Sequence, residues 1–357
     1  VRLSPDDPQS VLIRFFDEDG IDLSESDQRR VERMYHREEF RRVTAGEIGD
    51  IEFSPRAIEH YTADIVEAFG LRRDTARPIK LVLDLSYGAA SFVMPNLLSK
   101  IGADVLSINP FAQTPGMISV DRVASEARVA EAVRGSGADL GAVIDAGGER
   151  LTLIDDAGHV LTDDEAVLAF LHLSSVPDGG RVALPVTASV HAQRACESRG
   201  IEVVWSGLSN SALQQAAASG GVAFASDRRG GYAFPAFLPA FDAAAALACL
   251  IALLGWGSVP LSELVAGSPA MPILHDEVPT RPEQKGLIMR TLMEQLTEAG
   301  ADLVLVDGIK VRADDGWALV VPDPEDPVTH VWAEASDLVA SERLAASYVE
   351  RITRMMA

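Results

Sequence analysis

From residue 78 onward the sequence alternates between short apolar segments with strand character and longer segments with helical periodicity. No other feature constrains the fold as strongly. The strand-like segments lie at 80–84, 104–108 and 141–145, and the helix-like segments between them at 90–101 and 120–136. This alternation is typical of parallel strands joined by helical crossovers. We therefore predict an α/β fold whose sheets are covered by helices.

The alternation then repeats, which predicts tandem α/β domains with mixed sheets. After a hairpin at 151–161 and a T-x-x-E capping box from Thr162 to Glu165, the second set of segments lies at 181–186, 188–199, 201–205, 222–225 and 243–254. The last stretch differs, because a helix at 282–299 is followed by a hairpin at 309–321, a strand at 330–335 and a final helix. This order predicts an α+β C-terminal domain with an antiparallel sheet.

We predict four domains, at 1–72, 73–175, 176–268 and 269–357. The first contains a strand at 11–16 and helices at 24–40 and 55–69. These elements make less than a complete α/β layer, so the first domain is predicted to be N-terminally incomplete. The chain also begins at Val1 without Met. We expect an N-terminal portion of the protein to precede it, and a misassigned start is the alternative.

Composition limits the classes of function. The net charge of −22 and the pI near 4.6 oppose binding to nucleic acid or to an anionic membrane, so any phosphate site has to be built locally. Cys196 and Cys249 are isolated, which favours a reducing, cytoplasmic location. The seven His residues show no metal-binding spacing and are predicted to be surface or core residues. The apolar segment 243–254 is too short to span a bilayer and is predicted to be a core helix.

A short acidic loop, 145–150, follows the apolar segment 140–144. Asp145 and Glu149 are separated by Gly147, and Arg150 follows. Three carboxylates in such a loop would suit Mg²⁺, which prefers hard oxygen ligands in octahedral geometry. With Gly147 at the middle position, two carboxylates remain and are predicted to hold a cation weakly or not at all. The alternative is an ordinary strand-to-strand turn.

Four signatures in this order resemble the α-D-phosphohexomutases, which include phosphomannomutase and phosphoglucomutase. The first signature, at 4–17, is similar to the phosphoserine loop and the strand after it. The others are the metal-loop region 140–161, the sugar-loop region 226–235 and the fourth-domain region 307–327. The resemblance covers essentially the whole chain. It implies that a phosphoserine exchanges a phosphoryl group with a hexose phosphate in the presence of Mg²⁺.

The resemblance places Ser4 at the phosphoserine position and Arg150 at the end of the metal loop. Asp6 and Asp7 stand beside Ser4 in place of the family's His-Asn pair. Two negative charges disfavour a phosphoserine dianion, so Ser4 is predicted not to hold a stable phosphoryl group. The alternative interpretation is that Ser4 is a turn residue.

The two remaining loops also depart from the family pattern. Asp227, Arg228 and Arg229 occupy the sugar-loop position, where the family has Gly-Glu-x-Ser-Gly. Asp227 could accept hydrogen bonds from a sugar and the two Arg could contact phosphate, although a solvated turn is the alternative. In the fourth domain, Val-Pro-Asp-Pro-Glu-Asp-Pro at 321–327 replaces a phosphate loop that carries Arg and hydroxyl groups. Three acids and Pro324 there should repel phosphate.

Two hypotheses follow. The first is a non-catalytic phosphohexomutase-like module with a regulatory or assembly role. It resembles the C-terminal mutase-like region of bacterial fusion proteins that begin with a mannose-1-phosphate guanylyltransferase or a related sugar-nucleotide pyrophosphorylase. A nucleotidyltransferase domain of the same protein would then be its partner, and a hexose phosphate or sugar nucleotide its ligand. The second hypothesis is an active, Mg²⁺-dependent mutase that interconverts hexose 1- and 6-phosphates.

Overall fold

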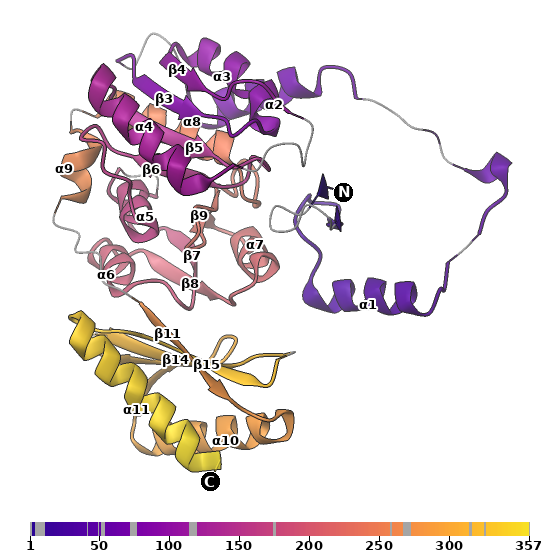
Figure 1. The fold of residues 1–357 in the computed structure, drawn as a ribbon, viewed down its shortest axis with the longest axis vertical. Helices are drawn as coiled ribbons and strands as arrows, with labels where there is room; N and C mark the ends of the chain where they lie inside the picture. Colours follow the sequence, from indigo (N-terminus) through magenta and orange to yellow (C-terminus); the bar gives the residue numbers. More distant parts are fainter. Residues whose placement is uncertain are drawn as a thin grey trace.

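The structure is a computed structural model of the 357-residue chain. It describes residues 2–3, 11–40, 42–48, 50, 54–71, 77–113, 120–173, 176–257, 259–266, 273–313, 316–324 and 326–356. Ser4 and the acids that follow it lie outside the described residues. Three main sheets follow one another along the molecule (Figure 1), and the predicted tandem α/β architecture with an α+β C-terminal part is confirmed.

The first of these sheets has the strand order β4-β3-β5-β6. Its strands are β3 (Lys80–Asp84), β4 (Asp104–Ile108), β5 (Leu140–Ile144) and β6 (Leu151–Ile154). The first three are parallel, and β6 returns antiparallel to β5. Its crossover elements are η2 (Ala89–Phe92), α3 (Met94–Ile101) and α4 (Arg122–Ser136). The predicted return strand near 159–161 amounts to a single bridge between Ile154 and Val160, after which α5 (Asp163–His172) begins at the predicted capping box.

The second sheet repeats this plan in the order β10-β9-β7-β8. Its strands are β7 (Arg181–Pro185), β8 (Glu202–Ser206), β9 (Val222–Ser226) and β10 (Tyr232–Ala233), and its helices are α6 (Val190–Ser198), α7 (Asn210–Ala218), α8 (Ala243–Trp256) and α9 (Leu261–Val265). Helix α8 is apolar on all sides and almost wholly buried, because it packs in a core shared by both sheets. No helix among the described residues is long and apolar enough to cross a membrane.

The third sheet is antiparallel, with the order β11-β15-β14-β13-β12. Its strands are β11 (Leu274–Pro279), β12 (Asp302–Val304), β13 (Ile309–Ala313), β14 (Gly316–Pro322) and β15 (Val328–Glu334). Helices α10 (Pro282–Glu298) and α11 (Leu338–Met356) cover one face (Figure 1), burying Ile288, Leu292 and Ile352 against Val320 and Val331. The predicted hairpin is β13–β14. The edge strand β11 was not predicted, because Leu-His-Asp-Glu-Val-Pro has little apolar alternation.

The other face of this sheet packs on the preceding unit. Lys310 is completely buried with its Nζ 4.4 Å from the ring centroids of both Trp205 and Trp317. Glu334 accepts hydrogen bonds from Trp317 Nε1 at 2.7 Å and from the backbone N–H of Val190 at 3.0 Å, at the start of α6. Burial lowers the pKa of Lys310 to about 7. Together with the hydrogen bond that the N–H of Leu208 donates to Asp307 Oδ2 at 2.7 Å, these groups form polar contacts between the two units.

The N-terminal stretch comprises β1 (Arg2–Leu3), β2 (Val11–Leu12), α1 (Glu25–His36), η1 (Ala45–Glu47) and α2 (Ala57–Ala68). The predicted strand at 11–16 is shorter than expected, because only β2 and a bridge between Phe16 and Asp22 are present. Helix α1 buries none of its residues and lies apart from the sheets (Figure 1). Helix α2 packs on α3 and α8, and Tyr61 donates a 2.5 Å hydrogen bond to Asp242.

Candidate functional site

The loop at 145–150 connects β5 to β6 and is closed by its own first residue. Asp145 Oδ1 accepts hydrogen bonds from the backbone N–H groups of Glu149 and Arg150, at 2.8 and 2.9 Å. Gly148 has a φ of +76°, a conformation that glycine adopts without strain. The Asp145 carboxylate therefore stabilises the turn between β5 and β6.

Glu149, the second candidate ligand, is engaged by a residue from the N-terminal stretch. Arg14 Nη1 forms an ion pair with Glu149, while Nε and Nη2 of the same guanidinium contact Asp22 at 3.0 and 2.7 Å. Asp22 in turn pairs with Gln214 of α7 through its backbone N–H and its carboxylate. Through Asp22, Arg14 thus connects the metal-loop position to α7, and its guanidinium competes with a cation for the Glu149 carboxylate.

This donor set fits a weak cation site and does not fit a tight Mg²⁺ site. The loop offers two carboxylates, one holding the turn and one paired with a guanidinium, and Gly147 supplies no side-chain oxygen. We expect Mg²⁺ to bind no more tightly than about millimolar and to change the melting temperature little. Titration calorimetry on the wild type and on Asp145→Ala checks this. Micromolar binding that disappears in the variant would contradict it.

Arg150 joins this loop to the sugar-loop position. Its Nη1 donates to Asp227 Oδ2 at 2.6 Å and to the carbonyl oxygen of Arg229 at 2.9 Å. The backbones also meet, because the N–H of Leu151 donates to the carbonyl oxygen of Gly230 at 2.9 Å. A Cβ on Gly230 would lie 2.8 Å from Leu151 O, so only glycine permits this approach. The structure therefore brings together Asp145, Glu149, Arg150, Asp227 and their loops, which are far apart in the sequence.

Asp227 is the centre of this junction. Its Oδ1 accepts from the N–H groups of Arg229 and Gly231, both at 2.8 Å, and its Oδ2 is bound by Arg150. Since the carboxylate is buried, removing it leaves the Arg150 charge and two N–H groups without their partner. We expect Asp227→Ala to lower the free energy of unfolding by about 2–4 kcal/mol. Asp227→Asn, which keeps one oxygen acceptor, should cost less, and chemical denaturation of both variants would show it.

The two arginines after Asp227 have different environments. Arg228 pairs with Asp164 at 3.1 Å, beside Asp163, and burial raises the pKa of Asp163 to about 6 against the opposing effect of Arg228. Arg229 is exposed, and its guanidinium makes no ion pair with the described residues.

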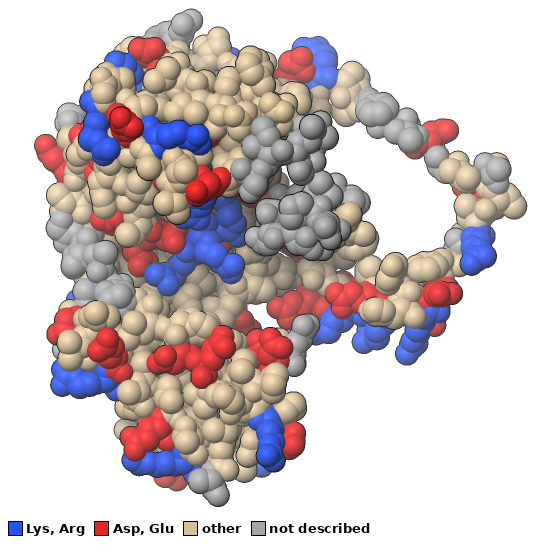
Figure 2. Space-filling view, viewed as in Figure 1, with Lys and Arg blue, Asp and Glu red and all other residues tan. Residues whose placement is uncertain are grey.

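Figure 2 shows basic side chains gathered near the middle of one face, close to β9 and α5. This local positive charge is what a phosphate site requires in a chain of net charge −22.

The loop at 321–327, at the predicted phosphate-loop position, lies in the β14–β15 connection. Asp323 Oδ1 accepts from the N–H of Asp326 at 2.7 Å, and Lys285 donates to the carbonyl oxygen of Asp323 at 2.5 Å. The described part of this loop therefore carries the acidic side chains of Asp323 and Asp326, and Lys285 binds the backbone carbonyl oxygens of both residues.

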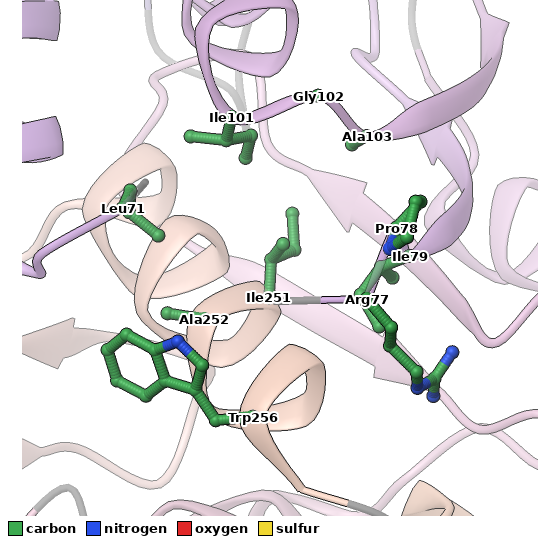
Figure 3. A pocket seen from close by; sticks show the side chains of 10 residues that line it. All are labelled: Leu71, Arg77, Pro78, Ile79, Ile101, Gly102, Ala103, Ile251, Ala252 and Trp256. Carbon is green, nitrogen blue, oxygen red and sulfur yellow. The ribbon is translucent and has the colours of Figure 1, made fainter. Parts of the chain in front are cut away.

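An apolar cavity of about 300 Å³ lies away from these loops, between α3, the start of β3 and the end of α8 (Figure 3). It is lined mainly by apolar groups, including Ile101, Ile251 and Trp256, and its one charged residue, Arg77, pairs with Asp139 at 2.9 Å. This cavity lacks the donors that a sugar phosphate needs, so we do not assign the site to it.

Two features of the site were missed by the sequence analysis. Arg14 belongs to the strand-like segment that resembles the strand after the family's phosphoserine loop, but its contact with Glu149 joins residues 135 positions apart. Asp163 and Asp164 were noted only as part of a helix start. A sequence pattern carries no signal for contacts of this kind, because they depend on how the units pack together.

Comparison with known proteins gives a consistent result. Residues 59–158 match the family described as phosphoglucomutase/phosphomannomutase, alpha/beta/alpha domain II. A probable phosphoglucosamine mutase of Methanopyrus kandleri is 27% identical over 357 residues, covering 99% of this chain and 78% of its own length. A phosphoglucomutase/phosphomannomutase of Thermococcus kodakarensis is 24% identical over 354 residues, covering 98% and 76%.

Solved structures share the fold. A phosphoglucomutase/phosphomannomutase family protein of Burkholderia thailandensis superposes with a TM-score of 0.75 at 19% identity, over 94% of this chain and 71% of that one. The N-acetylphosphoglucosamine mutase of Aspergillus fumigatus, in complex with GlcNAc-6P and magnesium, gives a TM-score of 0.57 at 14% identity, over 85% and 72%.

Proposed function

Because this chain has the fold of the alpha-D-phosphohexomutases and matches their domain II, we propose that it acts on hexose phosphates, interconverting the 1- and 6-phosphates. The observation that carries this proposal is the junction of the 145–150 and 226–231 loops, where Arg150 is held by Asp227 and Arg229 faces solvent. The similarity to probable phosphoglucosamine mutases over nearly the whole chain supports hexosamine phosphates as well as hexose phosphates as the substrate class.

The roles follow from the contacts. The guanidinium of Arg150 is held in place by the Asp227 carboxylate and the Arg229 carbonyl oxygen. Its side chain is therefore already oriented before a ligand binds. The exposed Arg229 can contact a phosphate dianion, which guanidinium groups bind well. Ser4 is the proposed phosphoryl acceptor by resemblance alone. Asp145 and Glu149 would supply a weak cation site.

A coupled assay with glucosamine, glucose and mannose phosphates, a hexose 1,6-bisphosphate activator and millimolar Mg²⁺ tests the proposal. We expect turnover. Intact-mass analysis that shows phosphorylation lost in Ser4→Ala would support the mutase, against the expectation from Asp6 and Asp7 that Ser4 holds no stable phosphoryl group. Arg229→Ala should weaken hexose phosphate binding about 10-fold or more, whereas the matched control Arg290→Ala, an exposed Arg on α10, should not. The absence of both turnover and hexose phosphate binding would overturn the proposal.

A second candidate function is favoured by the state of the loops. Asp145 is used by the turn, Glu149 by Arg14, and Gly147 offers no ligand. These contacts favour a module that binds a hexose phosphate without converting it. A role as a regulatory or assembly region for a sugar-nucleotide pyrophosphorylase of the mannose-1-phosphate guanylyltransferase type rests on the resemblance alone. Binding without turnover, no phosphoryl group on Ser4, and nucleotidyl transfer that changes when this chain is added or deleted would favour it over the mutase.

A further inference from the structure

Three potential metal ligands meet at the edge of the C-terminal sheet. They are His275 and Glu277 of β11 and His330 of β15, whose ligand atoms all lie within 4.8 Å of one another. Strand register explains the grouping, because Glu277 stands directly opposite His330 and His275 opposite Trp332. Residues two apart on a strand share a face, so all four side chains project from the same side of the sheet.

The spacing suits one ion. His275 Nε2 and His330 Nδ1 are 3.0 Å apart, and His330 Nδ1 is 3.7 Å from Glu277 Oε1. Two nitrogens that bind one Zn²⁺ at about 2.0–2.1 Å lie roughly 3 Å apart or slightly more. Only a small movement of the Glu277 side chain is then needed to bring its carboxylate to the same ion. This side chain is exposed and able to adjust.

Both imidazoles are oriented by neighbours. His330 Nε2 lies 3.0 Å from Asp323 Oδ2, and a carboxylate there favours a proton on Nε2, which leaves the lone pair of Nδ1 directed at His275 and Glu277. This is the arrangement in which a metal-binding His donates its other N–H to a carboxylate. The ring of His275 stacks on Trp332 with centroids 4.5 Å apart and planes 8° apart.

We propose that His275, Glu277 and His330 form a binding site for a divalent transition-metal ion of the Zn²⁺ class, with Asp323 as the residue that positions His330. Two imidazoles and one carboxylate select Zn²⁺, Ni²⁺ or Co²⁺ over Mg²⁺ and Ca²⁺, which prefer oxygen. Three protein ligands leave a position open for water or another ligand.

The proposal gives the 321–327 loop a role other than the phosphate binding implied by its position. Its Asp323 carboxylate bonds to His330 and to the N–H of Asp326, and Lys285 of α10 fixes its backbone. The loop therefore orients a metal ligand. The two cysteines do not compete for the ion, because both are buried and burial raises their pKa to about 11 for Cys196 and about 12 for Cys249.

The test uses the full chain and metal ions alone. We expect one equivalent of Zn²⁺ to bind with a roughly micromolar dissociation constant or tighter, and Co²⁺ to give d–d absorption bands that Zn²⁺ abolishes. His330→Ala and His275→Ala should each remove the bands. Asp323→Asn should weaken Zn²⁺ binding about 10–100-fold while keeping the same ligands.

His172→Ala is the matched control, since His172 is an exposed His at the end of α5, away from this cluster. It should bind Zn²⁺ like the wild type. Circular dichroism of each variant verifies folding, and Glu277→Gln on the exposed edge strand gives a further ligand-deleting variant should a His variant fail to fold. Absence of Zn²⁺ binding, or binding unchanged in both His275→Ala and Glu277→Gln, would overturn the proposal.

Discussion

Glu334→Ala should lower the free energy of unfolding by about 3–5 kcal/mol, the effect of removing one partner from a buried charged contact. The carboxylate is 1% exposed and accepts from Trp317 Nε1 and from the N–H of Val190. Its loss leaves these two donors without their acceptor and removes a negative charge that favours the protonated form of Lys310. Chemical denaturation followed by Trp fluorescence measures the change directly, because Trp205 and Trp317 lie at this contact.

Glu334→Gln is the matched control, because its amide oxygen can still accept both hydrogen bonds. It should cost less than Glu334→Ala, about 1–3 kcal/mol. Equal, small effects of both variants would show that the contact between the C-terminal sheet and α6 does not depend on this side chain.

The buried Lys310 also predicts a pH dependence. Its folded pKa of about 7 lies below the ordinary value of 10.5, so between these values the unfolded chain binds a proton that the folded chain does not. The contribution of Lys310 to stability therefore rises as pH increases from 7 to 10.5. Lys310→Met should flatten the pH dependence in this window. If the substitution left the slope of unfolding free energy against pH unchanged, groups other than Lys310 would cause the pH dependence.

Gly88→Ala should be the second large perturbation, with an expected loss of at least about 2–3 kcal/mol from overpacking against backbone. A Cβ on Gly88 would lie 2.6 Å from Ala146 Cα and 2.7 Å from Ala146 O. The φ of Gly88 is −93°, which alanine adopts freely, so the cost comes from this clash. Because Ala146 belongs to the 145–150 loop, the variant should also displace Arg150 from Asp227, and faster amide hydrogen exchange at Glu149 and Arg150 would report it.

Gly135→Ala gives the opposite expectation for the same chemical change. Gly135 lies in α4 with nothing within 4 Å of its added Cβ, and alanine favours helix by up to about 1 kcal/mol relative to glycine. A melting temperature raised in Gly135→Ala and lowered in Gly88→Ala would support the packing argument. Equal responses would contradict it.

The sequence predicted those parts of the fold that depend on local pattern. The strand–helix alternation, the buried α8 and the β13–β14 hairpin each follow from periodicity and turn residues within a few positions. Strand β11 was missed because it lies at a sheet edge, where charged side chains replace the apolar alternation of a central strand. The boundaries of the four domains and the assigned site residues stay predictions.

Contacts between distant segments could not be predicted. Asp145 and Arg150 were identified from one short loop, but the Arg14–Glu149 pair and the His275–His330 contact join residues 135 and 55 positions apart. The His residues were predicted to be ordinary because their spacing along the chain matches no motif. Their grouping arises from the pairing of β11 with β15, and this register is a property of the folded sheet.

The contact of Glu334 with Val190 spans 144 positions and has a consequence for folding during synthesis. A ribosome must add the whole C-terminal sheet, to the last residue of β15, before α6 receives this acceptor, and must reach β14 before Trp205 is covered by Lys310 and Trp317. Contacts of such long range form late, since the closure of a long loop is entropically unfavourable. The emerging chain therefore carries an uncovered apolar face during elongation, and that interval is when it is most exposed to aggregation and to chaperones.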